Sequence, residues 1–175
     1  MLLFFIGFLF IFLDYNYQVG EAIINLIPDF VGYIIVFIAC HGKIGRQSNH
    51  FILVRIVSVL LAVWGIVSFV MGIVSFDMHF IVRIGVNILT LLCSLYLTYE
   101  FTEGIKTYER SLCRPIGAGQ LSSAWTLLCM GNLIYYFSFF FESLYLVCVL
   151  LLVLSLIWFE YAVLYIHREL RKIKR

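Results

Sequence analysis

Long runs of apolar residues, broken by short clusters of charged and polar residues, follow one another along the whole chain. A helix needs about 20 mostly apolar residues to cross the hydrocarbon core of a bilayer. The runs therefore predict an all-α fold, a polytopic transmembrane bundle of about six helices in a single integral membrane domain over residues 1–175. The expected helices lie at about 2–17, 22–41, 51–76, 79–99, 121–141 and 143–166.

The first two runs depart from this pattern. The first has only about twelve residues before Asp14, and the second contains Pro28 and Asp29. Proline interrupts helices, and an acidic side chain is costly in hydrocarbon. The alternative for this region is one span followed by a re-entrant or interfacial segment.

The distribution of Lys and Arg predicts the orientation of the bundle, because cytoplasmic loops keep positive charge while translocated loops carry little. Basic residues fall in every second connection and in the C-terminal tail: Lys43, Arg46, Lys106, Arg110, Arg114, Arg168, Arg171, Lys172, Lys174 and Arg175. The opposite side carries acidic charges alone: Asp14, Glu21, Asp77 and Glu142. Both termini are therefore expected in the cytoplasm, with the basic tail as a topology anchor or, alternatively, as a site for anionic head groups or a partner.

Composition supports a membrane location. Hydrophobic residues make up 63% of the chain and charged residues 13%, and the mean hydropathy is +1.04. Soluble domains have about half apolar and about a quarter charged residues, so the lipid bilayer is the expected main partner. A membrane-protein partner or a second copy of the chain is a further candidate. The net charge of +2, with basic residues confined to helix ends, gives no reason to expect nucleic acid.

The connection 101–120 is the largest surface expected to face the cytosol. Its charged residues recur at helical spacing, which predicts that the fourth helix continues into solvent before Pro115. These residues are Glu103, Lys106, Glu109 and Arg110. Cys113, which lies among basic residues, is the cysteine most suited to reactivity or acylation. The five cysteines form no CxxC pair that would indicate a disulfide framework or a metal site.

One polar stripe stands out within the apolar runs. Its members recur in the fourth helix at steps of four, three, four and four, which places them on one helical face: Arg83, Asn87, Thr90, Ser94 and Thr98. This face should point to other helices or to a wet cavity, because hydrocarbon leaves polar groups unpaired. Two interpretations stay open, hydrogen bonding between helices and a path for a solute or ion. Asp29, expected at a similar depth, completes this candidate intramembrane site through an ion pair with Arg83, unless Arg83 snorkels to the head groups.

A second set of charges lies toward the expected inner side. Arg55 is near the start of the third helix, Glu100 is at the end of the fourth, and Glu160 is about two turns before the basic tail. These residues form a candidate inner charge cluster. The alternative is that each side chain simply reaches the membrane interface.

The stretch from Asn25 to Tyr33 combines a proline, a carboxylate and a glycine within about two turns. In one interpretation Pro28 begins a helix and Asp29 lies favourably at its positive end. In the other, a broken helix binds a cation or polar solute through freed carbonyls and Asp29. The segment Leu-Ile-Pro-Asp-Phe-x-Gly-Tyr, within residues 1–45, resembles that of small uncharacterised multi-pass membrane proteins of Gram-positive bacteria. The resemblance implies a bacterial cytoplasmic membrane and supplies no reaction or ligand.

Catalytic and metal-binding patterns are not visible in the sequence. The four histidines are never three or four residues apart, and no HExxH, GxSxG or phosphate-binding glycine loop occurs. We therefore expect no metal, no cofactor and no catalytic residues. The expected function is that of a non-enzymatic accessory, sensing or assembly component of the membrane. The alternative is a small transporter or channel for an ion or polar solute.

Overall fold

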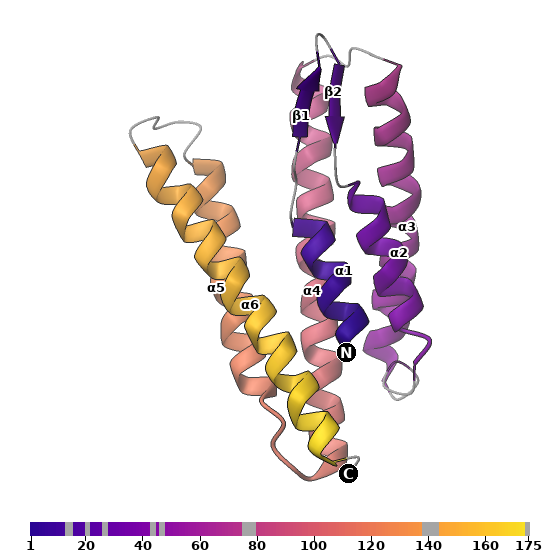
Figure 1. Ribbon diagram of the computed structural model, residues 1–175, viewed down its shortest axis with the longest axis vertical. Coiled ribbons are helices and arrows are strands. Elements are labelled where there is room, and N and C mark those ends of the chain that lie inside the picture. The colour runs from indigo at the N-terminus through magenta and orange to yellow at the C-terminus, as the bar shows by residue number, and fades with distance from the viewer. Residues whose placement is uncertain are drawn as a thin grey trace. The chain divides into compact units, whose positions relative to one another are not determined.

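The computed structural model describes residues 1–12, 16–19, 22–25, 28–42, 45, 48–74, 80–137 and 144–173. Helices dominate these residues, as the apolar runs predict, and one short hairpin of two strands accompanies them (Figure 1). In chain order the elements are α1 (Leu2–Phe12), β1 (Asn16–Val19), β2 (Ala22–Asn25), α2 (Asp29–Ala39), α3 (Asn49–Ile73), α4 (Phe80–Leu112), α5 (Ala118–Phe137) and α6 (Tyr145–Ile173).

Three of the described helices are long and apolar enough to cross a membrane: Asn49–Ile73, Val82–Leu112 and Tyr145–Ile173. Many of their large apolar side chains are exposed, among them Leu60 on α3 and Leu146 on α6 at 64% and 71%. A soluble protein rarely exposes apolar surface of this extent. The expected helical fold is thus confirmed, and three of its described helices are suited to crossing a membrane.

The prediction for the first two helices was wrong in extent. The expected helix 2–17 ends at Phe12, and the expected helix 22–41 begins only at Asp29 and ends at Ala39. Pro28 is extended, with φ −64° and ψ 124°, and forms the N-cap of α2. Because proline has no backbone N–H to continue the hydrogen-bond ladder, it starts a helix here instead of lying within one.

The residues between these helices include an antiparallel hairpin that the sequence analysis did not predict. Asn16 pairs with Asn25 and Val19 pairs with Ala22, and β2 also packs against α3. The strands contain tyrosine, valine and isoleucine, which favour extended backbone. A helix of 11 residues is about 16 Å long, roughly half of the hydrocarbon core, so neither α1 nor α2 crosses it alone.

Two glycines let α1 and α2 approach closely. A Cβ atom added at Gly7 would lie 2.6 Å from Cγ2 of Val36, and one added at Gly32 would lie 2.6 Å from the carbonyl oxygen of Gly7. Only a residue without a side chain fits at either position. Close backbone approach through glycine is a common way to pack helices in a membrane, where dispersion contacts replace the hydrophobic effect as the driving force.

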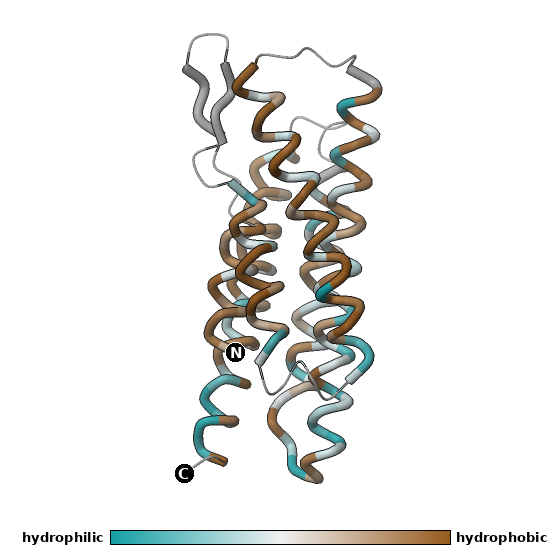
Figure 2. The backbone as a smooth tube through the Cα atoms, turned by 90° about the vertical axis from the view of Figure 1, so that its right-hand side faces the viewer, coloured by the Kyte–Doolittle hydropathy of each residue, from teal (hydrophilic) through white to brown (hydrophobic). Residues whose placement is uncertain are grey.

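The chain, expected to form a single domain, packs as two compact units. The N-terminal unit comprises Leu3–Phe101, and the C-terminal unit comprises Thr102–Arg175 together with Met1–Leu2. Helix α4 contributes to both, because its 33 residues run without a break from Phe80 to Leu112. This confirms the predicted continuation of the fourth helix past its apolar part. The end of α6 nearest the C-terminus is also hydrophilic (Figure 2).

Four phenylalanines from three helices form the core of the N-terminal unit. Phe4 and Phe8 on α1 surround Phe101 on α4, with ring centroids 4.8 and 4.9 Å from it, and Phe51 on α3 lies 6.1 Å from Phe4. All four side chains are almost fully buried. Each such aromatic pair contributes about 0.5 to 1.5 kcal/mol beyond its buried area, so this cluster fixes α1 against α3 and α4.

The C-terminal unit is built on the antiparallel pair α5 and α6. Leu121, Ala124 and Leu128 bury one face of α5, and Phe159, Val163 and Ile166 are buried on α6. A Cβ atom at Gly131 would lie 2.6 Å from Oγ of Ser155, so this glycine sets the close approach of the two helices.

The charges on which the expected orientation depends are only partly described. Lys43, Arg46, Lys174 and Arg175 lie outside the described residues, as do Asp14, Glu21, Asp77 and Glu142. The described basic residues fall at the end of α4, in the turn after it and at the end of α6.

Candidate functional site

The polar stripe of α4 divides into a covered part and an exposed part. Ser94 and Thr98 are buried, and Thr90 is half-buried. Their hydroxyl groups donate to carbonyl oxygens one turn earlier on the same helix: Thr90 to Val86 at 2.9 Å, Ser94 to Thr90 at 2.8 Å and Thr98 to Leu95 at 2.9 Å. Each of these three hydroxyl groups therefore has a hydrogen-bond acceptor within α4.

Ser94 also joins α4 to α2. Its oxygen lies 2.7 Å from the hydroxyl oxygen of Tyr33, which is 2% exposed. A hydroxyl has one proton, and that of Ser94 goes to the Thr90 carbonyl, so Tyr33 is the donor in this contact. The sequence analysis missed Tyr33 as a site residue, although it follows Asp29 by four residues and so shares its helical face.

Arg83 and Asn87 belong to the exposed part of the stripe. Gly85, between them in the sequence, has no atom of another element within 4 Å of a Cβ position. Asp29 is the first residue of α2 and is half-buried. The structure thus separates the buried pair Ser94 and Thr98 from the exposed Arg83 and Asn87, and the ion pair between Asp29 and Arg83 stays a prediction.

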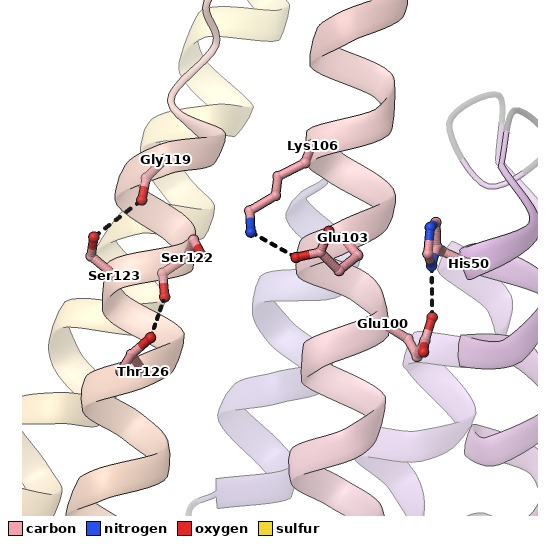
Figure 3. Close-up of polar contacts among 8 residues, drawn as sticks. All are labelled: His50, Glu100, Glu103, Lys106, Gly119, Ser122, Ser123 and Thr126. Atoms are coloured by element: carbon pink, nitrogen blue, oxygen red, sulfur yellow. Dashed lines mark hydrogen bonds and ion pairs between the residues drawn. The ribbon is translucent and has the colours of Figure 1, made fainter.

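Glu100 has a partner that the sequence analysis did not identify. Its Oε2 lies 2.8 Å from Nδ1 of His50, which is in the first turn of α3 (Figure 3). The carboxylate side chain is 8% exposed. The histidine is held at the start of the helix by its N-cap, because the Ser48 side chain accepts from the His50 backbone N–H at 3.2 Å.

The grouping of Arg55, Glu100 and Glu160 into one inner cluster stays a prediction. Glu100 pairs with His50, whereas Arg55 lies five residues further along α3. Glu160 belongs to α6 in the C-terminal unit and is 6% exposed. Neither of its carboxylate oxygens has a hydrogen-bond partner among the described residues. A buried carboxylate in this state is costly in a membrane, and such residues commonly mark functional positions.

The turn between α4 and α5 is held by Glu109. Its Oε2 accepts hydrogen bonds from the backbone N–H groups of Ile116 and Ala118, at 2.7 and 2.9 Å. Cys113 has a positive φ of 48° in this turn, is exposed and carries a free thiol. Gly117 has φ 97°, a conformation that favours glycine.

Two lysines in this part of the chain form local ion pairs. Nζ of Lys106 lies 2.6 Å from Oε1 of Glu103 (Figure 3), and Nζ of Lys172 lies 2.6 Å from Oε1 of Glu169. On α5 the hydroxyls of Ser123 and Thr126 donate to the carbonyl oxygens of Gly119 and Ser122, as the same view shows. Across the described part of the chain, no group of three or more His, Cys, Asp or Glu side chains is arranged to hold a metal ion.

Comparison with known proteins adds no relative. No family, no curated protein and no solved structure matches this chain.

Proposed function

We propose that this chain is a multi-pass protein of a bacterial cytoplasmic membrane, with both termini in the cytoplasm, and that it acts there as a non-enzymatic accessory, sensing or assembly component. One observation carries the proposal. Five buried hydroxyl and amide side chains of the long helices donate to carbonyl groups of their own helix: Ser58, Ser94, Thr98, Asn132 and Ser155. Polar groups bonded in this way support packing and leave little hydrogen-bonding capacity for a passing solute.

The contacts between helices support the same proposal. The Tyr33 to Ser94 bond joins α2 to α4, and the phenylalanine cluster packs α1 against α3 and α4. The exposed apolar residues of α3 and α6 suit lipid or the apolar face of a partner subunit. The proposed orientation rests on the charge pattern of the sequence.

A flux assay tests this proposal. The protein would be reconstituted in liposomes that contain a pH-sensitive dye, under imposed gradients of protons, sodium and potassium. We expect the same leak rate as in protein-free liposomes, because the buried polar groups bond within their own helices. A flux that is well above the leak rate and falls in Ser94→Ala would contradict the proposal.

A small transporter or channel is the second candidate. Two observations favour it, the exposed Arg83 and Asn87 on α4 and the buried Glu160 without a hydrogen-bond partner among the described residues. Ionisable groups within a membrane often belong to ion or proton pathways. This function predicts that a transported cation raises the melting temperature of the protein, and that Glu160→Gln or Asp29→Ala removes this effect.

A further inference from the structure

One end of the C-terminal unit collects four arginines. Arg110 lies in the last turn of α4, Arg114 follows in the next turn, and Arg168 and Arg171 lie in the last turns of α6. All four are exposed. Figure 1 shows the ends of α4 and α6 on the same side of this unit. We call these four residues the arginine end.

Contacts within the unit hold the arginine end together. Glu109 on α4 binds the backbone of Ile116 and Ala118, so the turn folds back beside the last part of α4. Gly117 packs against α6, because a Cβ atom there would lie 2.8 Å from the ring of Tyr165. Glu109 and the turn therefore lie at about the same level along α6 as Tyr165. Arg168 and Arg171 follow Tyr165 along this helix.

The acidic side chains at this end form ion pairs or hydrogen bonds with groups other than the four arginines. Glu103 pairs with Lys106, Glu169 pairs with Lys172, and Glu109 accepts the two backbone hydrogen bonds of the turn. By contrast, none of the four arginine side chains forms an ion pair or hydrogen bond with any residue that the structure describes. Four guanidinium groups thus remain available for an external anion.

Distance along α4 separates these arginines from the lipid head groups. Glu100, which pairs with His50 at the first turn of α3, marks the end of the apolar part of both helices. Glu109 is nine residues further on, about 13 Å along a helix. The head-group layer on one side of a bilayer is only about 5 to 7 Å thick. With the apolar part of α4 in the hydrocarbon core, the last turn of α4, which contains Arg110, would therefore lie beyond the head groups.

The chemistry of the four side chains indicates the partner. Guanidinium groups bind carboxylates through two parallel hydrogen bonds, and they lose less hydration energy than lysine in doing so. The net charge of the chain is only +2, so it lacks the strongly basic surface that is typical of nucleic-acid-binding proteins. We propose that the arginine end binds an acidic, carboxylate-rich segment of a soluble cytosolic protein. This inference rests on the proposed function, which places this end in the cytosol.

The first test uses the full chain in nanodiscs of zwitterionic phosphatidylcholine, with a fluorescein-labelled peptide of ten glutamates as the probe. Anisotropy titration would give the Kd for the wild type, for Arg110→Gln/Arg171→Gln and for the matched control Lys106→Gln/Lys172→Gln. Both double variants remove two positive charges. Only the arginine variant removes charges that have no ion-pair partner among the described residues. We expect the Kd to rise at least about fivefold in the arginine variant and less than about twofold in the control. Equal effects, or no binding to the wild type, would overturn the inference.

Two further titrations separate the competing partners. Adding about one third phosphatidylglycerol to the discs should leave peptide binding within about twofold, because the arginines lie beyond the head groups. Loss of binding in these discs would assign the arginines to anionic lipid instead. Tighter binding of a ten-nucleotide single-stranded DNA than of the peptide would assign them to nucleic acid. The flux assay tests the proposed function separately. If the peptide does not bind and no solute flux is measured, this inference is wrong and the proposed function still stands.

Discussion

At the scale of single residues, the side chains that connect helices can be told apart from those that serve only their own helix. Thr98 donates within α4, whereas Ser94 both donates to Thr90 and accepts from Tyr33. The contribution of the Tyr33 hydroxyl to stability should therefore exceed that of a tyrosine at the surface.

Replacing Tyr33 with phenylalanine removes this donor and keeps the ring. Hydrogen bonds between helices in a membrane average about 0.6 kcal/mol, so we expect the free energy of unfolding to fall by about 0.5 to 1 kcal/mol. Unfolding in mixed detergent micelles would measure it. Tyr145→Phe is the matched control, because Tyr145 is 50% exposed and keeps its ring contact with Tyr135. An equal loss in both variants would show that the Tyr33 bond contributes nothing specific.

Glu109 provides a second residue-scale prediction. Glu109→Ala leaves two backbone N–H groups of the turn without an acceptor, and hydrogen bonds to a charged group contribute about 1.5 to 3 kcal/mol. We expect faster hydrogen exchange at Ile116 and Ala118 and a lower melting temperature. Glu103→Ala, which breaks only a surface pair of about 0.2 to 1 kcal/mol, should leave exchange in the turn unchanged. Unchanged exchange in Glu109→Ala would contradict the role given to this carboxylate.

At the scale of elements, glycines decide how closely neighbouring helices pack. Gly32→Ala should separate α1 from α2, because the added Cβ meets the backbone of Gly7, which cannot rotate away. Gly85→Ala meets nothing within 4 Å and should stabilise α4 by up to about 1 kcal/mol through helix propensity. Melting temperatures of the two variants should therefore shift in opposite directions. A Gly32→Ala protein as stable as the wild type would show that α1 and α2 do not pack through this glycine.

The extent to which elements follow from sequence differs along the chain. The apolar runs predicted α3 and α6 well, and helical charge spacing predicted the polar extension of α4. The hairpin between α1 and α2 was missed because length and hydropathy alone were used, although Tyr17, Ile23 and Ile24 favour strands. The partners Tyr33 and His50 were missed for a different reason, since which helix lies beside α4 depends on tertiary packing.

At the scale of the whole molecule, the orientation can be tested through a natural thiol. Cys113 is exposed in the turn after α4, whereas the other cysteines are buried or half-buried. With both termini in the cytoplasm, a membrane-impermeant maleimide should label the protein in inside-out vesicles and not in intact cells. Cys113→Ser should abolish the labelling. Labelling from outside the cell would reverse the proposed topology.

The continuity of α4 has a mechanical consequence. A helix of 33 residues is about 50 Å long, and α4 passes from the apolar part of the chain to the turn at Cys113 without a kink-forming proline. Helices respond to a change in bilayer thickness by tilting. A tilt of about 10° would move the end of α4, about 20 Å past Glu100, sideways by roughly 3 Å. In the proposed orientation, a change in membrane thickness would therefore displace the cytoplasmic end of α4.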